Sequence, residues 1–385
     1  MRNPFKSQPE PTRGDEGADI VGPRNPAREQ QEPFTLRPPA TDHGSMPNLK
    51  WSFADSHTRI EKGGWAREAT VRELPIAKDL AGVNMRLVSG AVRELHWHKQ
   101  AEWAYMLKGR ARITAVDEQG RTFADDVAEG DLWFFPPGIP HSIQGLDSDV
   151  DGCEFLLVFD DGTFSEETTF LLTDWLAHTP KDILAKNFGT SEARLSALPN
   201  KELYIFPAPK PGVLEADKIS GAGPVPTSFS HRLHEQAPQR FAGGTIRIAD
   251  SKIFPAAKTV AAALVELDPG ALRELHWHPT ADEWQYYIEG EARMTVFGAE
   301  QKARTFDFRS GDVGYVPFAM AHYVENTGSS RLRFFEIFKS DHYADVSLNQ
   351  WLASTPRTLV EAHLNLDANV LSEIPAEKTP IRSKR

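Results

Sequence analysis

Cysteine is almost absent from this sequence, in which Cys153 is the sole example. A single thiol cannot form a disulfide within the chain, and it excludes a metal site built from several cysteines. Long apolar runs are also missing, since no stretch approaches the roughly 18 apolar residues of a membrane-spanning helix. The opening letters MRNPFKSQPE contain no apolar segment of the kind found in signal peptides. We therefore expect a cytoplasmic protein that has no membrane partner.

The sequence has fewer basic than acidic residues. It contains 43 lysines and arginines and 54 aspartates and glutamates, which gives a formal net charge of -11. Nucleic acids and anionic lipid surfaces attract basic proteins, so neither is an expected partner. An anionic substrate would instead need a local cation, either a metal ion or an arginine. Apolar residues form 40% of the chain, as in globular proteins, and a length of 385 residues favours two domains.

Apolar residues are scarce over residues 1–48, where Pro, Arg, Glu, Asp and Gly dominate. A segment of this composition cannot bury enough surface to fold alone, so we expect an extended, partly disordered N-terminal arm. Two arrangements are open for this arm. Either it is solvated, or it lies along another domain or subunit, anchored by Phe34, Leu36 and Trp51.

The rest of the sequence consists of two similar copies. The letters RELHWH occur at residues 93–98 and again at 273–278, and a proline, Pro75 or Pro255, precedes each motif at the same distance. Further along, the letters DWLAHTP are echoed by QWLASTP. The chain is therefore a tandem duplication, and a proline-rich passage between about residues 200 and 232 marks the join.

Each copy contains short runs of β-branched and aromatic residues separated by Gly, Pro and Asp, a pattern typical of antiparallel strands. No alternation of strands with long helices is present, so the predicted fold class is all-β, a sandwich or barrel. The strands expected in the first copy are 83–88, 103–107, 112–116, 132–135 and 155–159. Short helical segments are expected after each barrel, at 173–188 and 348–364, with N-caps at Thr173-Asp174 and at Ser347.

Each copy also repeats three histidines and one glutamate. Residues two apart on a strand point to the same face, so His96 and His98 face one cavity while Trp97 turns away. Imidazole nitrogens and a carboxylate oxygen suit Mn(II), Fe(II) or Zn, and the pattern predicts two metal sites. The alternative, histidines that fill a core or hold a structural metal, does not account for eight residues in matched spacing. The predicted ligands are His96, His98, Glu102 and His141 in the first site, and His276, His278, Glu283 and His322 in the second.

These motifs resemble those of the cupin superfamily. Residues 90–109 match the first cupin motif throughout, and residues 130–141 match the second. The departures are Gly145 in place of an asparagine, one additional residue before Glu283, and Ala319 in place of a glycine. The resemblance implies a bicupin, with tandem jelly-roll barrels at residues 49–231 and 232–385.

Two arginines occupy matched positions, Arg93 and Arg273, three residues before each first histidine. On an unbroken strand this odd offset would point the arginine away from the metal, so it reaches the pocket only if a bulge or turn intervenes. Its repetition favours a role, because the arginine fork binds a carboxylate through two hydrogen bonds. The alternative is a duplicated surface arginine.

The two copies differ after their last barrel strand. Matching residues 155–159 with 334–338 places Glu336 on a strand where the first copy has Leu157. The first copy instead carries a polar stretch over about residues 160–170, and such a loop beside a barrel mouth is typical of a mobile lid. Each copy thus has its own candidate proton-transfer carboxylate, Glu166 or Glu336, although a loop carboxylate is ordinarily solvated.

The two RELHWH motifs, the DDGTFSEETTF loop and the DWLAHTP segment are together similar to those of the bacterial oxalate decarboxylases. This resemblance implies a carboxy-lyase that converts oxalate to formate and carbon dioxide, with Mn(II) in both barrels and dioxygen as co-catalyst. It implies that Glu166 transfers the proton, that Arg93 polarises the substrate, and that the chain forms a hexamer of paired trimers. The family's loop usually reads Ser-Glu-Asn-Ser-Thr, so the additional carboxylate of Glu167 bears on lid closure.

Three other functions are compatible with the same pattern. An oxalate oxidase shares the barrel and ligands, and the ratio of formate to peroxide distinguishes it. A metal-dependent dioxygenase or isomerase acting on another small acid is possible in principle, because the fold alone does not fix the reaction. A non-enzymatic bicupin of the seed-storage type generally lacks the full ligand set that both copies retain here.

Overall fold

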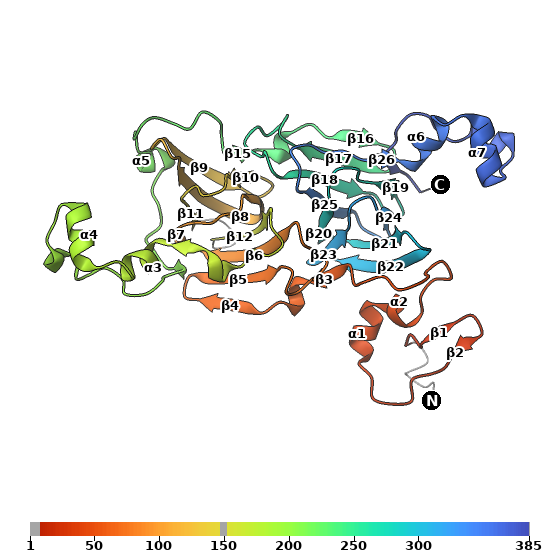
Figure 1. Cartoon of the computed structure of the whole chain (residues 1–385), viewed down its shortest axis with the longest axis horizontal. Coiled ribbons are helices and arrows are strands. Elements are labelled where there is room, and N and C mark those ends of the chain that lie inside the picture. Colours follow the sequence, from red (N-terminus) through yellow and green to blue (C-terminus); the bar gives the residue numbers. More distant parts are fainter. Residues whose placement is uncertain (1–7, 147–151, 385) are drawn as a thin grey trace. The chain divides into compact units, whose positions relative to one another are not determined.

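The structure is a computed structural model that describes residues 8–146 and 152–384, and residues 1–7 of the predicted arm lie outside this description. The chain divides into two compact units, each built around one β-barrel (Figure 1). The first-barrel unit comprises residues 55–237 and 249–261. The second-barrel unit comprises the other described residues, which include residues 8–54. Each copy of the repeat thus forms one barrel.

In the first-barrel unit all pairings between strands of the barrel are antiparallel, as predicted. The long strand β8 joins two sheets, because its beginning pairs with β10 and β12 while its end pairs with β9 and β11. Gly109 lies between the two halves at φ +78°, and a Cβ there would stand 2.0 Å from the carbonyl oxygen of Gly152. The two strands predicted at 103–107 and 112–116 are therefore one strand that changes sheets. The strands are β4 Thr58–Glu61, β5 Gly64–Ala69, β6 Ala81–Val88, β7 Val92–Trp97, β8 Glu102–Val116, β9 Thr122–Ala128, β10 Leu132–Phe135, β11 His141–Gly145, β12 Gly152–Phe159, β13 Phe170–Leu171, β14 Ile205–Phe206 and β15 Ser230–His231.

The second barrel is built from two separate antiparallel sheets. One has the order β16-β17-β18-β25-β20-β23-β3, and the other has the order β22-β21-β24-β19-β26, with β27 added beside β19. Its core contains fully buried aromatic side chains, among them Trp284, Tyr287 and Tyr315. The strands are β3 Lys50–Ser52, β16 Gln239–Phe241, β17 Gly244–Ala249, β18 Ala261–Leu267, β19 Leu272–Trp277, β20 Glu283–Glu289, β21 Glu291–Gly298, β22 Lys302–Arg309, β23 Asp312–Val316, β24 Ala321–Asn326, β25 Leu332–Phe338, β26 Val346–Ser347 and β27 Ile381–Arg382.

Short helices follow each barrel, as predicted, but each predicted segment is broken into two. The breaks fall at Pro180 and Pro356, since proline cannot donate the backbone hydrogen bond that would continue a helix. None of the helices within the described ranges has the length and apolar character needed to cross a bilayer. The helices are α3 Leu172–Ala177, α4 Lys181–Phe188, α5 Leu214–Asp217, α6 Leu348–Ala353, α7 Arg357–Leu364 and α8 Ala368–Ser372.

One of the two predicted N-caps is confirmed. Ser347 caps α6, because its hydroxyl accepts a hydrogen bond from the backbone nitrogen of Gln350 (3.3 Å). The cap predicted at Thr173-Asp174 is wrong, since α3 begins at Leu172. The hydroxyl of Thr173 instead donates to the buried carboxylate of Glu94 (2.9 Å), a contact far along the chain that local sequence does not reveal.

The described part of the N-terminal arm lies along the second barrel. It contains the short strands β1 (Thr12–Arg13) and β2 (Glu16–Gly17) and the helices α1 (Pro26–Gln31) and α2 (Pro33–Leu36). The carboxylate of Asp42 accepts hydrogen bonds from the backbone and the hydroxyl of Thr305 (2.9 and 2.7 Å). The ring of Phe34 lies beneath the guanidinium of Arg293, and β3 pairs with β23. These contacts give polar, apolar and backbone anchors to a segment with no core of its own.

Candidate metal centres and active site

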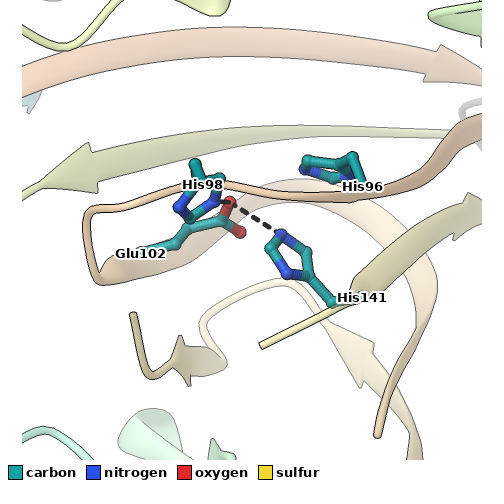
Figure 2. A group of neighbouring side chains, drawn as sticks. All are labelled: His96, His98, Glu102 and His141. Atoms are coloured by element: carbon teal, nitrogen blue, oxygen red, sulfur yellow. Dashed lines mark hydrogen bonds and ion pairs between the residues drawn. The ribbon is translucent and has the colours of Figure 1, made fainter. Parts of the chain in front are cut away.

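The four predicted ligands of the first site meet inside the first barrel. His96 is the next-to-last residue of β7, His98 lies in the following turn, Glu102 begins β8 and His141 begins β11, where it is the register partner of His96. Figure 2 shows the side chains of His98, Glu102 and His141 meeting, with His96 on the same stretch of chain as His98. All four are buried, and their candidate ligand atoms lie within 4.8 Å of one another. The structure therefore confirms that these residues form one cluster.

Each histidine of the first site is held in one orientation by a backbone carbonyl. The Nδ1 atoms of His96, His98 and His141 lie 2.6, 2.7 and 2.7 Å from carbonyl oxygens of residues 94, 100 and 139. Nδ1 therefore carries the proton and donates it, which leaves Nε2 with a lone pair directed into the cluster. Burial, with a contribution from Arg93, lowers the pKa of His96 well below its usual value, so this ring is neutral and able to coordinate.

The carboxylate of Glu102 is kept ionised. Burial alone would raise its pKa, but the neighbouring imidazoles of His141 and His98 outweigh that effect and lower the pKa. Its second oxygen accepts a hydrogen bond from the indole nitrogen of the fully buried Trp133 (3.1 Å). Trp133 was not predicted as a site residue, because a tryptophan within an apolar strand is ordinarily part of a core.

The four ligands of the second site form an equivalent cluster in the second barrel, from β19 and the residue that follows it, β20 and β24. The Nδ1 atoms of His276, His278 and His322 lie 2.7, 2.8 and 3.1 Å from carbonyl oxygens. Glu283 is oriented by the side-chain amide of Gln285 (2.8 Å), which in turn accepts from the hydroxyl of Tyr287 (2.8 Å). The two sites thus share ligands but differ in what supports the glutamate.

The donor atoms in both clusters fit a divalent metal ion. The Nε2 atoms of His141 and His322 and the Oε2 atom of Glu283 are buried, and within the described residues they have no hydrogen-bond partner. A buried polar atom without a partner is costly, and a coordinated cation removes that cost. Three imidazoles and one carboxylate form a donor set that suits Mn(II), Fe(II) or Zn.

Both arginines reach their barrel interiors through an irregular strand, as the predicted bulge required. The pairing of β7 with β11 shifts register between His96 and Arg93, and the pairing of β19 with β24 shifts between His276 and Arg273. Both arginines are buried. The alternative of a duplicated surface arginine is therefore wrong.

The surroundings of the two arginines differ. Within the described residues, the only side-chain hydrogen bond of Arg93 runs from Nη1 to the carbonyl oxygen of Tyr204 (3.4 Å), and its guanidinium lies 4.2 Å above the Tyr204 ring. Arg273 instead donates from Nε to Glu336 (2.9 Å) and from Nη2 to Asp345 (2.7 Å) and to the hydroxyl of Tyr343 (2.8 Å). Burial alone would lower the pKa of Arg273, but these acidic neighbours raise it well above its usual value.

Glu166 is folded inward and is not solvated. It begins the 3-10 turn η3 (Glu166–Thr168), and only 8% of its surface is exposed. Burial is the largest effect on its carboxyl group and raises the pKa to about 7, against the opposing charge of Arg93. Two residues earlier, Phe164 stacks on Phe159 and meets the ring of His98 edge to face. The predicted lid therefore lies over the first cluster with its carboxylate inside.

Glu336, the candidate carboxylate of the second copy, is fully buried on β25. Besides its ion pair with Arg273, it accepts a hydrogen bond from the hydroxyl of Tyr343 (3.0 Å). The sequence signal for Tyr343 and Asp345 is weak, because both lie beyond the last long strand of the barrel. Tyr204 of the first site lies still further from the motifs, and nothing in the local sequence marks it.

Comparison with known proteins identifies the family of this fold. The sequence profile described as Cupin matches residues 52–195 and again residues 231–372. The chain belongs to the cupin family. This cupin is 60% identical to the oxalate decarboxylase OxdC of Bacillus subtilis, over 98% of its own length and 97% of that relative. It is 44% identical to a probable oxalate decarboxylase of Arthroderma benhamiae, over 95% and 91% of the two chains.

Solved structures agree with this assignment. An OxdC mutant of Bacillus subtilis matches this cupin with a TM-score of 0.95 and 60% identity, covering 98% of this chain and 100% of that chain. A structure concerned with the Mn(II) centers of Bacillus subtilis oxalate decarboxylase matches with the same score and coverage. The predicted bicupin architecture, two tandem jelly-roll barrels in one chain, is confirmed.

Proposed function

We propose that this cupin is a carboxy-lyase that converts oxalate to formate and carbon dioxide. The observation that carries the proposal is the first site, where three histidines and a glutamate converge beneath a lid whose own glutamate is buried near Arg93. The 60% identity to a named oxalate decarboxylase over nearly the full chain supports the same reaction. Incubating the Mn-loaded protein with oxalate and measuring formate and peroxide together tests it.

Each barrel is proposed to hold one Mn(II), bound by His96, His98, Glu102 and His141 in the first and by His276, His278, Glu283 and His322 in the second. Bound Mn(II), with dioxygen as co-catalyst, supplies a reversible one-electron oxidation of the substrate, which makes loss of carbon dioxide easy. The fit of the donor atoms and the Mn(II) centers of the Bacillus subtilis relative support this choice.

The protein's own groups bind the substrate and move its proton. Mono-protonated oxalate contains every atom of formate and carbon dioxide, so the overall reaction is redox-neutral. The Arg93 guanidinium orients and polarises one carboxylate, since its donors are largely free of protein partners. The carboxylate of Glu166 accepts the substrate proton and later returns it to the carbon atom from which carbon dioxide has departed.

Glu166 also selects the product. A carboxyl group with a pKa of about 7 exchanges protons readily near neutrality and below, and the closed lid keeps water away from the reacting carbon. If no acid is in place, further oxidation to a second carbon dioxide competes, with peroxide released. The oxalate oxidase alternative is thus the outcome expected of the same site without its proton donor.

We propose that oxalate is converted at the first site, because the arginine of that site is less neutralised by protein carboxylates than the arginine of the second. Among the residues that the structure describes, Arg93 has no acidic hydrogen-bond partner, whereas Arg273 is neutralised by Glu336 and Asp345. An oxalate anion therefore finds more positive charge in the first barrel. Glu336 and Arg273 are proposed to act as a pair that supports the second metal centre, so their loss disturbs that centre less specifically.

A homo-hexamer of paired trimers is proposed for the assembly, as the family resemblance implies. The helices after each barrel expose large apolar side chains, among them Trp175, Phe188, Trp351 and Leu359. Exposed apolar groups on neighbouring helical turns favour protein contacts. Sedimentation velocity of the wild type and of Trp351→Ser tests this, because a hexamer that uses this helix should dissociate in the variant.

A further inference from the structure

The base of the lid is fixed to the first barrel. Gly162 donates a backbone hydrogen bond to Lys78 and accepts one from Val71, both 2.9 Å long. A Cβ at Gly162 would lie 2.0 Å from the carbonyl oxygen of Ala77, so the loop is pressed against this segment. The base of the lid is therefore held whatever the conformation of its tip.

The tip of the lid, residues 165–169, is joined to the described part of the barrel by a single hydrogen bond that involves a side chain. The backbone nitrogen of Glu166 donates to Oε1 of Glu68 on β5 at 2.6 Å. The other side-chain hydrogen bonds of the tip are local, such as that from the Glu167 nitrogen to the Ser165 hydroxyl (3.2 Å). Within the described residues, no other hydrogen bond that involves a side chain joins the tip to the barrel. The position of the catalytic carboxylate thus depends on Glu68.

Charged groups surround this contact on both sides. Around Glu68 lie Arg72, which pairs with its other oxygen, and Glu73 on the next turn. Around Glu166 lie Arg93, Arg59 and Glu102 in addition to Glu68. Burial raises the pKa of Glu68, while the Glu166 amide and Arg72 favour its ionised form. The negative charge of Glu68 in turn contributes to the raised pKa of Glu166.

The duplication supplies an internal comparison. Strand β5 runs from Gly64 to Ala69 and strand β17 from Gly244 to Ala249, and both begin with a glycine at φ +152°. This match aligns Glu68 with Ile248. The second copy lacks the lid and also lacks a carboxylate at this position. The carboxylate that accepts the lid hydrogen bond is therefore present in the first copy, which has the lid, and absent from the second copy, which does not.

We propose that Glu68 is a positioning residue that latches the lid of the first site closed and so keeps Glu166 over the substrate. This inference rests on the proposed function, in which Glu166 transfers the proton. Glu68 does not touch the substrate, and it acts through the backbone of Glu166. Loss of the latch should open the tip, expose the reacting carbon to water and shift the product from formate toward peroxide.

Three variants of the Mn-loaded full chain test this. Glu68→Ile copies the second barrel and removes the acceptor, while Glu68→Gln keeps an oxygen acceptor without the charge. Glu73→Gln is the matched control, because it makes the same change of charge five residues away and leaves the Glu166 amide paired. We measure hydrogen exchange of the peptide that covers residues 160–170, metal content, and the ratio of formate to peroxide.

We expect exchange of this peptide to be at least about tenfold faster in Glu68→Ile, because a hydrogen bond to a charged group shifts an equilibrium by one to two powers of ten. The ratio of formate to peroxide should fall with it, at unchanged metal content. Glu68→Gln should keep the slow exchange and move the alkaline limb of the formate pH profile to lower pH, since a like charge beside Glu166 is removed. Glu73→Gln should match the wild type in all three measurements.

Unchanged exchange and product ratio in Glu68→Ile would overturn the latch, as would equal effects in Glu73→Gln. A general loss of structure in Glu68→Ile would appear as faster exchange throughout the first barrel. In that case Glu68→Gln is the deciding variant, because the latch predicts that the lid tip of Glu68→Gln stays protected from exchange. If the wild type makes no formate, the proposed function fails, while the exchange measurement still tests the latch separately.

Discussion

Arg273 and Glu336 form a fully buried ion pair, with Nε 2.9 Å from Oε1, and the described part of the first barrel contains no counterpart of this pair. Leu157 occupies the position that corresponds to Glu336, so the guanidinium of Arg93 has no carboxylate to neutralise it on that strand. Together with the additional pairing of Arg273 to Asp345, this difference leaves Arg273 neutralised by protein carboxylates and Arg93 available to an anion. We therefore expect substitution of Arg93 and substitution of Arg273 to have different effects.

Arg93→Ala should lose substrate binding, and Arg273→Ala should lose stability. Removing Arg93 should lower kcat/KM for oxalate at least about 30-fold, through the lost charged contact. Removing Arg273 leaves the carboxylate of Glu336 buried without its cationic partner, which costs roughly 3–5 kcal/mol of unfolding free energy. Steady-state kinetics and thermal unfolding of both variants check this. A large stability loss in Arg93→Ala with unchanged KM would contradict the assignment.

Glu166→Ala should abolish formate production and spare the metal. Loss of a positioned acid or base typically costs about 100- to 10,000-fold in rate. Formate, peroxide and Mn content are measured side by side. The control is Glu167→Gln, because this neighbouring carboxylate is exposed and its loss should leave formate as the main product. Unchanged formate output in Glu166→Ala would refute the proton-transfer role.

Closure of the lid should become weaker as pH rises. The pKa of Glu166 is raised to about 7 when it is buried, from an ordinary value of 4.5. A carboxyl group whose pKa is raised in the closed state stabilises that state fully below 4.5, and this contribution is lost as pH rises through about 7. Hydrogen exchange of residues 165–169, corrected for its intrinsic pH dependence, should therefore accelerate between pH 5 and pH 8. Glu166→Gln should remove this dependence, and its persistence there would assign it to another group.

Single ligand substitutions should separate the two metal centres. His141→Ala and His322→Ala should each lower the metal content from two ions per chain to about one, because each removes one of four ligands. Formate production should disappear in His141→Ala and fall only in part in His322→Ala. Elemental analysis and product assays measure both quantities. The reverse pattern of activity would place turnover in the second barrel.

Much of the site could be predicted from the sequence because its residues follow local sequence patterns. Alternation along a strand places His96 and His98 on one face, and the repeated spacing identifies Glu102 and His141. The odd offset of Arg93 from His96 showed that a bulge is needed to bring the arginine into the barrel. The sequence alone did not show that this bulge exists. The lid carboxylate was recognised through family resemblance, whereas its composition alone indicated a solvated loop.

The features that sequence reasoning missed depend on contacts between distant segments. Glu94 draws the Thr173 hydroxyl away from the helix cap that local propensity predicted. Trp133 and Tyr204 serve the first site from positions whose local patterns indicate core and loop. The latch at Glu68 is marked only by comparison with Ile248 in the other copy. Such contacts are fixed by tertiary packing, which propensity and periodicity do not encode.

The most direct test is the carbon balance of the Mn-loaded protein acting on oxalate in mildly acidic, aerated buffer. We expect one formate and one carbon dioxide for each oxalate consumed, with little peroxide, and no turnover in protein stripped of metal. Two carbon dioxide molecules and one peroxide per oxalate, without formate, would contradict the account.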